Sequence, residues 1–419
     1  MRLAVVVQRY AADVTGGAEY HARRVAEHLA QAGHDVTVLT STSRDARRWD
    51  DAYPAGVTRE GGVRVHRFPV RRRLWRNLAR LAESARTLLG DSPVTLGQAW
   101  SMWANPYVPE MIEHLARNEP QYRAVFFFTY FYYPSLVGSL VAPTFRIGVP
   151  LGHDDEDFST PVVRRMLRAF DAIVANSEDE QRLIEGVLGG VTRPITVAGC
   201  GIDPPPARIP PPPIDAPYVV YLGRIKNGTE VLAPAMRRFR AKHGAELFER
   251  GDGTTFRGSE LVFAAVGDPD LGPQLGHGWF VAGHVDADTR WAWTAGSEVL
   301  INPSLYESLS LTLLEAWWVG RPVLARAQCA VMANQVARAE GGETFFDVVS
   351  FADALADLLR SRARRAEMGA RGQLFARARY GWPAVMERYA EVLAKVPEHP
   401  PVHGDPAQLP ATTRRHTSA

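Results

Sequence analysis

The chain has little cysteine, little lysine and no long apolar run. Its 419 residues include two cysteines, Cys200 and Cys329. Two thiols are too few for a disulfide framework or a cysteine zinc site, and they favour a reducing compartment. No stretch approaches the roughly 20 apolar residues of a membrane span, and the apolar run near the start is too short for a signal peptide. We therefore expect a cytoplasmic protein that is neither exported by this route nor integral to a membrane.

The composition is that of an ordinary soluble globular protein. Hydrophobic residues make up 46% of the chain and charged residues 22%, and the net charge is +2. This balance excludes a disordered or fibrous chain, and we expect no nucleic-acid partner. The length exceeds what one hydrophobic core usually serves, so the sequence predicts two domains of roughly 150 to 200 residues each.

Short apolar runs alternate with helical periodicity along most of the chain. Residues 2–10, 16–33 and 34–41 form a strand, a helix and a second strand, which is a βαβ unit. Continuous apolar strands of this kind are typical of a parallel sheet covered on both faces. Further strand-like runs follow at residues 124–131, 145–152, 169–177 and 194–201.

A proline-dense segment interrupts this alternation at residues 203–217, "DPPPARIPPPPIDAP". Such a segment can neither pair in a sheet nor continue a helix, so we place a linker there. The same alternation restarts after it, which predicts an α/β protein with two doubly wound, Rossmann-like domains facing each other across a cleft. The predicted parts are domain 1–202, linker 203–217, domain 218–381, a helix 382–396 that closes the second domain or crosses back to the first, and a disordered tail 397–419.

Open α/β sheets bind ligands at the carboxyl ends of their strands, so the loops there are the candidate sites. In the first, "TGGAE", Gly16 and Gly17 precede a helix expected to begin near residue 18 or 19. Their amides suit an anion, although a simple turn explains the glycines equally well. The chain has neither a G-x-G-x-x-G fingerprint nor a P-loop, which disfavours dinucleotide and nucleoside-triphosphatase functions.

Two further loops carry charge. In "LGRIKNG", Arg224 and Lys226 follow a buried strand, and only three of the 48 basic residues are lysines. A guanidinium and an ammonium together suit a diphosphate, whereas surface solubility is the plainer explanation. In "PLGHDDEDF", His153 is a candidate hydrogen-bonding group. Residues 155–157 resemble a D-x-D metal motif, but we favour a solvated acidic turn and expect no metal.

The fourth loop, residues 301–320, carries Glu307 and Glu315 in an otherwise apolar stretch. We expect residues 308–311 to form the first turn of a helix, which would place the two carboxylates about 12 Å apart along it. That is too far for one acid/base pair and suits two ends of an elongated ligand, with phosphates at the amides between them. The alternative is a pair of helix caps or buried salt-bridge partners, since unpaired buried carboxylates are costly.

Together these segments resemble the retaining glycosyltransferases of family 4, which have the GT-B fold. The resemblance extends to about residue 395 and is carried by "GGAEYHARRVAEHLAQAGHDVTVLT", the His153 loop, "AFDAIVANSEDE", "VAGCGID", "YLGRIKNGTEVL" and "PSLYESLSLTLLEAWWVGRPVLA". It implies transfer of a sugar from a UDP- or GDP-sugar to a hydroxyl of a glycan, lipid-linked or small-molecule acceptor. It implies neither cofactor nor metal. A donor phosphate oxygen would help to take the acceptor proton, so no protein nucleophile is required.

The resemblance also implies roles for individual residues. Glu315 would bind the ribose, Glu307 would bind hydroxyls of the transferred sugar, and the amides of Ser308, Leu309, Ser310 and Leu311 would bind the phosphates and sugar. Arg224 and Lys226 would neutralise the departing diphosphate, and His153 would bind the donor sugar. The amides of Gly16 and Gly17 would bind the donor, and the backbone of His284 and Val285 would bind the base. The chain departs from the family in one respect, because its arginine and lysine are unusually close together.

Other interpretations stay open from the sequence. A sugar phosphorylase or sugar-nucleotide epimerase would share the GT-B architecture. An NAD-dependent dehydrogenase would require the missing glycine fingerprint, and a two-domain sugar-binding receptor would normally be exported.

The acceptor side is less defined. Residues 64–86 carry eight arginines and one glutamate, with apolar residues at roughly helical spacing. Peripheral docking of this basic stretch on anionic lipid is one interpretation, and a solvated arginine face is the commoner one. The aromatic run at residues 126–133 is expected to be mostly a buried strand whose end could stack on a sugar.

Overall fold

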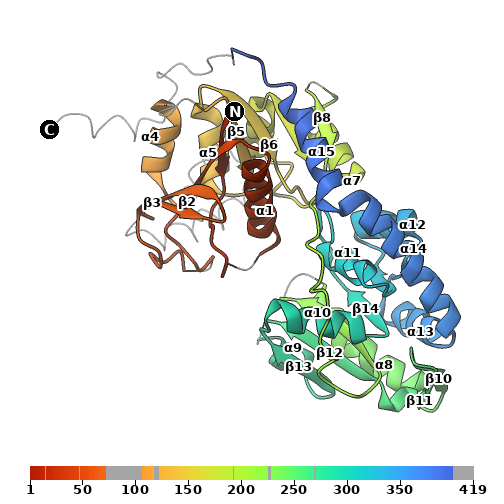
Figure 1. Cartoon of the computed structure of the whole chain (residues 1–419). Coiled ribbons are helices and arrows are strands. Elements are labelled where there is room, and N and C mark those ends of the chain that lie inside the picture. The colour runs from red at the N-terminus through yellow and green to blue at the C-terminus, as the bar shows by residue number, and fades with distance from the viewer. Residues whose placement is uncertain are drawn as a thin grey trace, which may run out of the picture. The chain divides into compact units, whose positions relative to one another are not determined.

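The computed structural model describes residues 1–14, 16–46, 48–71, 106–117, 122–191, 193–224, 228–268 and 270–399. It divides into two compact units. The first is Met1–Gly199 together with the chain from Met386 onward, and the second is Cys200–Val385. The proline-rich segment lies at the start of the second unit, where Pro212 packs beside Gly296. Figure 1 labels many of the helices and strands of both units.

The first unit is built around an eight-stranded sheet with the strand order β3-β4-β2-β1-β5-β6-β7-β8. All neighbouring strands are parallel except β3, which pairs antiparallel with β4 at the edge. Its elements are β1 (Arg2–Val6), α1 (Gly17–Gln31), β2 (Asp35–Ser41), β3 (Gly56–Glu60), β4 (Val63–Phe68), α4 (Pro109–Arg117), β5 (Ala124–Phe128), α5 (Tyr133–Val141), β6 (Phe145–Val149), α6 (Pro161–Ala169), β7 (Ala172–Ala175), α7 (Glu178–Leu188) and β8 (Ile195–Val197).

Strand β5 shows how this sheet is covered on both faces. Val125 and Phe127 belong to the core cluster formed with α4, α5, α6 and α7. Phe126 and Phe128 alternate with them and are also fully buried. Because successive side chains of a strand point to opposite faces, an unbroken apolar run requires helices on both sides of the sheet.

The last helix, α15 (Trp382–Leu393), closes the second face of this sheet. Its residues from Met386 onward belong to the first unit. The ring of Tyr389 lies 6.0 Å from that of Phe126, and its hydroxyl is 2.9 Å from Nε2 of His21 on α1. Burial lowers the pKa of His21 to about 3, so this histidine is neutral and structural.

The second unit contains a six-stranded, all-parallel sheet with the order β13-β12-β9-β14-β15-β16. Two parallel α/β sheets were predicted, and both are present. The elements are β9 (Tyr218–Gly223), η1 (Thr229–Val231), α8 (Leu232–His243), β10 (Leu247–Glu249), β11 (Thr255–Arg257), η2 (Gly258–Glu260), β12 (Val262–Gly267), α9 (Leu271–Leu275), β13 (Trp279–Gly283), α10 (Ala287–Gly296), β14 (Val299–Asn302), α11 (Leu311–Trp318), β15 (Val323–Arg326), α12 (Ala330–Ala339), β16 (Gly342–Phe345), α13 (Val348–Leu359) and α14 (Arg362–Tyr380).

Helix α11 is fixed by the side chain of Trp317. The indole is fully buried and donates a hydrogen bond of 2.8 Å from Nε1 to the carbonyl of Gly341. A Cβ atom at Gly372 of α14 would lie 2.3 Å from the same indole. The missing side chain therefore lets α14 pack closely on α11, which makes α11 a rigid part of the second unit.

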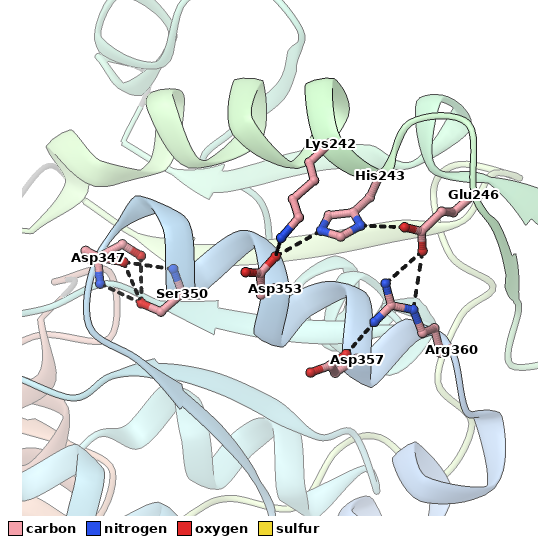
Figure 2. Close-up of polar contacts among 8 residues, drawn as sticks. All are labelled: Lys242, His243, Glu246, Asp347, Ser350, Asp353, Asp357 and Arg360. Carbon is pink, nitrogen blue, oxygen red and sulfur yellow. Dashed lines mark hydrogen bonds and ion pairs between the residues drawn. The ribbon is translucent and has the colours of Figure 1, made fainter.

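A charge network joins α8 to α13 on the other side of this unit (Figure 2). The ring nitrogens of the buried His243 lie 2.8 Å from Oε1 of Glu246 and 3.1 Å from Oδ1 of Asp353. Lys242 also contacts Asp353, and Arg360 contacts Glu246. Hydrogen bonds from His243 and Arg360 lower the pKa of Glu246, and those from Lys242 and His243 lower the pKa of Asp353.

Among the residues that the structure describes, no helix is both long enough and apolar enough to span a membrane.

Candidate functional site

The turns that follow β9 and β14 touch each other in the second unit. Gly228, in the turn after β9, has a φ of 109°, and a Cβ atom there would lie 1.9 Å from the carbonyl oxygen of Pro303. Pro303 directly follows β14. Only glycine can approach that closely at this φ, so the sequence "KNG" allows the predicted Arg224 turn to pack on the predicted Glu307 turn. Lys226 lies outside the described residues.

Tyr221 of β9 marks where the charged groups of these turns gather. Its hydroxyl donates a 2.6 Å hydrogen bond to the carbonyl oxygen of Arg224. Burial raises the pKa of Tyr221, the nearby Glu307 raises it further, Arg224 lowers it, and Asp268 raises it. Three charged side chains are therefore within electrostatic range of one buried hydroxyl.

These three side chains follow three adjacent strands. Asp268 comes after β12, Arg224 after β9 and Glu307 after β14, and β9 pairs with both other strands. Arg224 is exposed and Glu307 is half-buried. The carboxyl edge of the sheet thus carries a guanidinium suited to phosphate beside carboxylates suited to hydroxyl groups.

The expectation for the start of α11 was wrong. The helix begins at Leu311, and Ser310 is its N-cap residue, so residues 308–310 lie in the preceding turn. Ser310 is held there by Asn302, which donates to its hydroxyl over 2.9 Å, and by Gln335, which accepts from its amide over 3.1 Å and donates to its carbonyl over 3.2 Å. Glu307 therefore lies before the helix, and the separation of 12 Å along one helix does not apply.

This correction also changes which amides are available. The Ser310 amide is engaged by Gln335, whereas those of the first helical residues, from Leu311 on, have no acceptor within their own helix. Ser308 and Leu309 are buried in the turn. The positive end of α11 thus begins next to Glu307, which suits an anionic group.

Glu315 lies in the second turn of α11 and is paired with Arg290 of α10. Nη1 and Nη2 of Arg290 donate to Oε1 and Oε2 of Glu315 over 2.6 and 2.5 Å. The Glu315 side chain is 14% exposed and that of Arg290 is 41% exposed. Burial raises the pKa of Glu315. The positive charge of Arg290 lowers this pKa, and the negative charge of Asp203 raises it further. The sequence analysis missed Arg290, whose one signal is its position a turn beyond the predicted base-binding loop.

That loop, His284 and Val285, lies between β13 and α10 at the same edge of the sheet. His284 is exposed and Val285 is half-buried. Asp286 caps α10 by accepting a 2.7 Å hydrogen bond from the Thr289 amide. The predicted base-binding, ribose-binding and phosphate-binding segments therefore all belong to the carboxyl edge of one sheet.

In the first unit, α1 begins at Gly17, slightly earlier than expected, with Gly16 as its N-cap at φ 154°. The carboxylate of Glu19 fills the space beside Gly16, because a Cβ atom there would lie 2.2 Å from its Oε2. Gln8 and Arg9 donate to Oε1 of Glu19 over 2.8 and 2.6 Å. The two glycines therefore do open a helix, as an anion site requires, but a glutamate shapes that turn.

His153 follows β6 and is half-buried. Its Nδ1 lies 3.9 Å from Oδ2 of Asp155, which accepts a 2.8 Å hydrogen bond from the hydroxyl of Tyr130. The other oxygen of Asp155 accepts from the Phe158 amide. Within the ranges described, no cluster of three histidine, cysteine or acidic side chains could hold a metal ion. Asp155 thus orders the His153 turn through contacts within the protein.

Glu180, a residue that the sequence analysis did not single out, holds the base of the same turn. It is buried on α7 and accepts the amides of Gly152 and Asn176 over 2.5 and 2.6 Å. Burial raises its pKa to about 7, against the effect of these two hydrogen bonds. One carboxylate therefore ties the ends of β6 and β7 together directly before His153.

The aromatic run was expected to be mostly a buried strand. It is largely buried, with Tyr130 6% exposed, but β5 ends at Phe128 and the run continues through a turn to the start of α5 at Tyr133. The first residues of the basic stretch 64–86 belong to strand β4, Val63–Phe68. Residues 72–86, which carry its apolar stripe of Leu74, Trp75, Leu78, Leu81 and Ala85, lie outside the described part of the chain.

Solved structures with this fold cover nearly the whole chain. Sucrose-phosphate synthase from Thermosynechococcus elongatus aligns with a TM-score of 0.66 and 17% identity over 94% of this chain and 98% of its own. The E. coli trehalose-6-phosphate structure bound with UDP-2-fluoro glucose aligns with a TM-score of 0.66 and 14% identity over 96% and 100%. Anabaena HepE in complex with UDP-glucose gives 0.63 and 15% over 94% and 99%. At these identities the alignments establish the fold, which is GT-B.

The sequence itself matches two family models. Glycosyltransferase Family 4 matches residues 15–205, and Glycosyl transferases group 1 matches residues 216–361. No curated protein matches the sequence significantly. The chain belongs to the family 4, group 1 glycosyltransferases, which are retaining enzymes that use nucleotide-sugar donors, as the sequence motifs predicted.

Proposed function

We propose that this enzyme transfers a hexose from a UDP-sugar, with retention, to a hydroxyl group of a glycan, lipid-linked or small-molecule acceptor. The observation that carries the proposal is the joined pair of turns at Gly228 and Pro303. They put Arg224 and Glu307 around one buried tyrosine hydroxyl, next to the start of α11. UDP is the first choice of nucleotide because structures with this fold hold UDP and UDP-glucose.

Each side chain has a role that its chemistry supports. Arg224 would neutralise the departing diphosphate, which stabilises the transition state electrostatically. Glu307 would accept hydrogen bonds from hydroxyls of the transferred sugar, and Glu315 those of the ribose. The amides at the start of α11 would bind phosphate, with Ser310 excluded from that set because its amide is engaged by Gln335.

The remaining assignments stay predictions from the family resemblance. They are the contacts of Gly16 and Gly17 through their amides, of His153 to the donor sugar, of Lys226 to the diphosphate and of the loop at His284 and Val285 to the base.

The direct test is calorimetric titration of the purified protein with UDP-, GDP- and ADP-sugars, followed by product analysis with a panel of acceptors. We expect binding of the UDP-sugar and a glycosylated acceptor whose anomeric configuration matches that of the donor. Release of a sugar 1-phosphate would indicate a phosphorylase, and a changed sugar on the same nucleotide would indicate an epimerase.

The division of labour between the two glutamates is a further prediction. Glu307→Gln should abolish transfer and leave UDP affinity largely intact, because the change is at the sugar. Glu315→Ala should weaken UDP binding itself. Equal loss of UDP affinity in both variants would contradict this assignment, with transfer rates and calorimetry as the two measurements.

A further inference from the structure

The Arg290 and Glu315 pair has a geometry that leaves the carboxylate free to serve a ligand. The guanidinium meets both carboxylate oxygens, one nitrogen to each, at 2.6 and 2.5 Å. A fork of this kind holds the two groups coplanar and sets the direction in which the carboxylate faces. An ammonium or a single donor would not fix that plane.

Each carboxylate oxygen has two lone pairs, so the fork uses half of the acceptor capacity of Glu315. The second lone pair of each oxygen points away from Arg290. Because the fork takes the two lone pairs that face forward, the remaining ones lie on opposite outer edges of the carboxylate, and one oxygen at a time can accept from the neighbouring hydroxyls of a vicinal diol. The ribose of a nucleotide presents such a diol at its 2′ and 3′ positions.

The charge on Glu315 depends on the same pair. Burial and the negative charge of Asp203 both raise its pKa, and Arg290 supplies the opposing positive charge. A protonated carboxyl would accept fewer hydrogen bonds and would pair less well with the arginine. Arg290 thus favours the ionised form that a diol requires.

Arg290 also connects two predicted parts of the donor site. It lies on α10, one turn after the helix starts at Ala287, and that start directly follows His284 and Val285. Glu315 lies on α11, which Trp317 fixes in the core. The ion pair therefore ties the helix that follows the predicted base loop to the helix that carries the ribose carboxylate.

We infer that Arg290 is a positioning residue that presents Glu315 to the 2′ and 3′ hydroxyls of the donor nucleotide, so that the pair selects ribonucleotides over deoxyribonucleotides. This inference rests on the proposed function. Arg290 acts through Glu315 and has no part in the bond that breaks.

The test compares UDP with 2′-deoxy-UDP by calorimetry in the wild type, Arg290→Gln and Arg290→Lys. The wild type should bind UDP more tightly than 2′-deoxy-UDP. Arg290→Gln should weaken UDP binding by at least about tenfold and affect 2′-deoxy-UDP much less, so that the two affinities converge. Arg290→Lys keeps the positive charge but loses the two-pronged contact with Glu315. It should bind UDP more tightly than Arg290→Gln, but it should discriminate little better between UDP and 2′-deoxy-UDP.

A second measurement separates positioning from a general loss of structure. UDP affinity should fall more steeply with falling pH in Arg290→Gln than in the wild type, because loss of the guanidinium raises the pKa of Glu315 further. Titration of the UDP phosphate is common to both proteins. Arg371→Gln on α14, which removes the exposed contacts with Glu340 and Glu367, is the matched control and should change neither affinity nor selectivity.

The outcomes distinguish the two proposals. If the wild type binds UDP and Arg290→Gln binds it equally or more tightly, with unchanged selectivity, the inference is overturned and the proposed function is not. If the wild type binds none of UDP, GDP and ADP, the proposed function fails and the inference fails with it. An unchanged circular dichroism spectrum confirms that the variants are folded, and in the Glu315→Gln background Arg290→Gln should have little further effect.

Discussion

The two units use charge differently in the turns that follow their strands. In the first unit the carboxylates of Glu19 and Glu180 are directed inward, to neighbouring side chains and to backbone amides. In the second unit Arg224 is exposed, Glu307 is half-buried and Glu315 is paired with the side chain of Arg290. The same α/β architecture therefore shapes its turns with charge in one unit and leaves charged side chains at the end of its sheet in the other.

This difference indicates what each half contributes. A carboxylate that accepts two backbone amides, as Glu180 does, fixes the path of the chain. A guanidinium in an exposed turn fixes little and is available to an anion. Substitutions in the second unit should thus mainly affect catalysis, and substitutions of the inward carboxylates should mainly affect stability.

The largest effect is expected for Arg224→Ala. If Arg224 neutralises the departing diphosphate, as proposed, removing its charge should lower kcat by about a hundredfold to a thousandfold. The side chain is exposed, so the thermal midpoint should hardly change. Initial rates with a UDP-sugar at saturating acceptor, measured beside thermal unfolding, test this.

A loss of stability in Arg224→Ala comparable to that of a core substitution would break the comparison, because the residue would then be shaping its turn. Arg364 on α14 of the same unit, which is paired with Glu343 on the surface, gives the control Arg364→Gln. That variant should retain both rate and midpoint.

An intermediate effect is expected for Glu180→Gln. The pKa of Glu180 is raised from 4.5 to about 7, so its contribution to stability is fully present below pH 4.5 and is lost as the pH rises through about 7. The shift corresponds to about 3 kcal/mol between these limits. Thermal midpoints measured from about pH 5 to about pH 8 should fall in the wild type and vary less in the variant.

The matched control for this experiment is Glu185→Gln on the same helix, since the carboxylate of Glu185 accepts a hydrogen bond from the side chain of Gln181. Its pH profile should follow the wild type. Glu180→Gln also places an amide group against one of the two backbone N–H groups, so it should be less stable than the wild type at acid pH. A pH slope equal to that of the wild type would show that Glu180 is not the titrating group.

The smallest effect is expected for His243→Gln, in the network of Figure 2, because His243 is the last residue of α8 and the turn with Arg224 and Gly228 precedes the start of that helix. The change should lower stability by about 1 kcal/mol and leave kcat unaltered, because the partner carboxylates are about 40% exposed and therefore partly screened by water. The lowered pKa values of Glu246 and Asp353 mean that the network stabilises above their ordinary pKa values and stops doing so as the pH falls through the lower, folded-state values. Urea unfolding at neutral and acid pH should show the gap between the two proteins closing in acid.

Sequence patterns predicted the architecture because it depends on local order. Continuous apolar runs such as residues 124–128 indicated parallel strands buried on both faces, and β5 has that environment. The antiparallel edge strand β3 was not predicted, since residues 56–60 are mostly exposed and lack an apolar run. Its position depends on pairing with β4, which is a tertiary property.

The same distinction explains the errors in the site. The start of α11 was misplaced because Ser310 is held outside the helix by Gln335, 25 residues further along the chain. The partner of Glu315 was missed for a similar reason, as Arg290 is 25 residues earlier. Periodicity and motif spacing predict where strands end and where charged turns lie. They do not predict side-chain pairs between elements, because those pairs form only when the chain folds.

The helix α15 has a consequence for the order in which the protein is made. Tyr389 of α15 packs on Phe126 and His21 of the first unit, but it follows the whole second unit in the sequence. During translation, residues 200–385 are all synthesised before Tyr389 can make these contacts. The first unit is therefore begun first and finished last, and a ribosome-bound nascent chain lacks the contacts of Tyr389 with Phe126 and His21 until α15 has been synthesised.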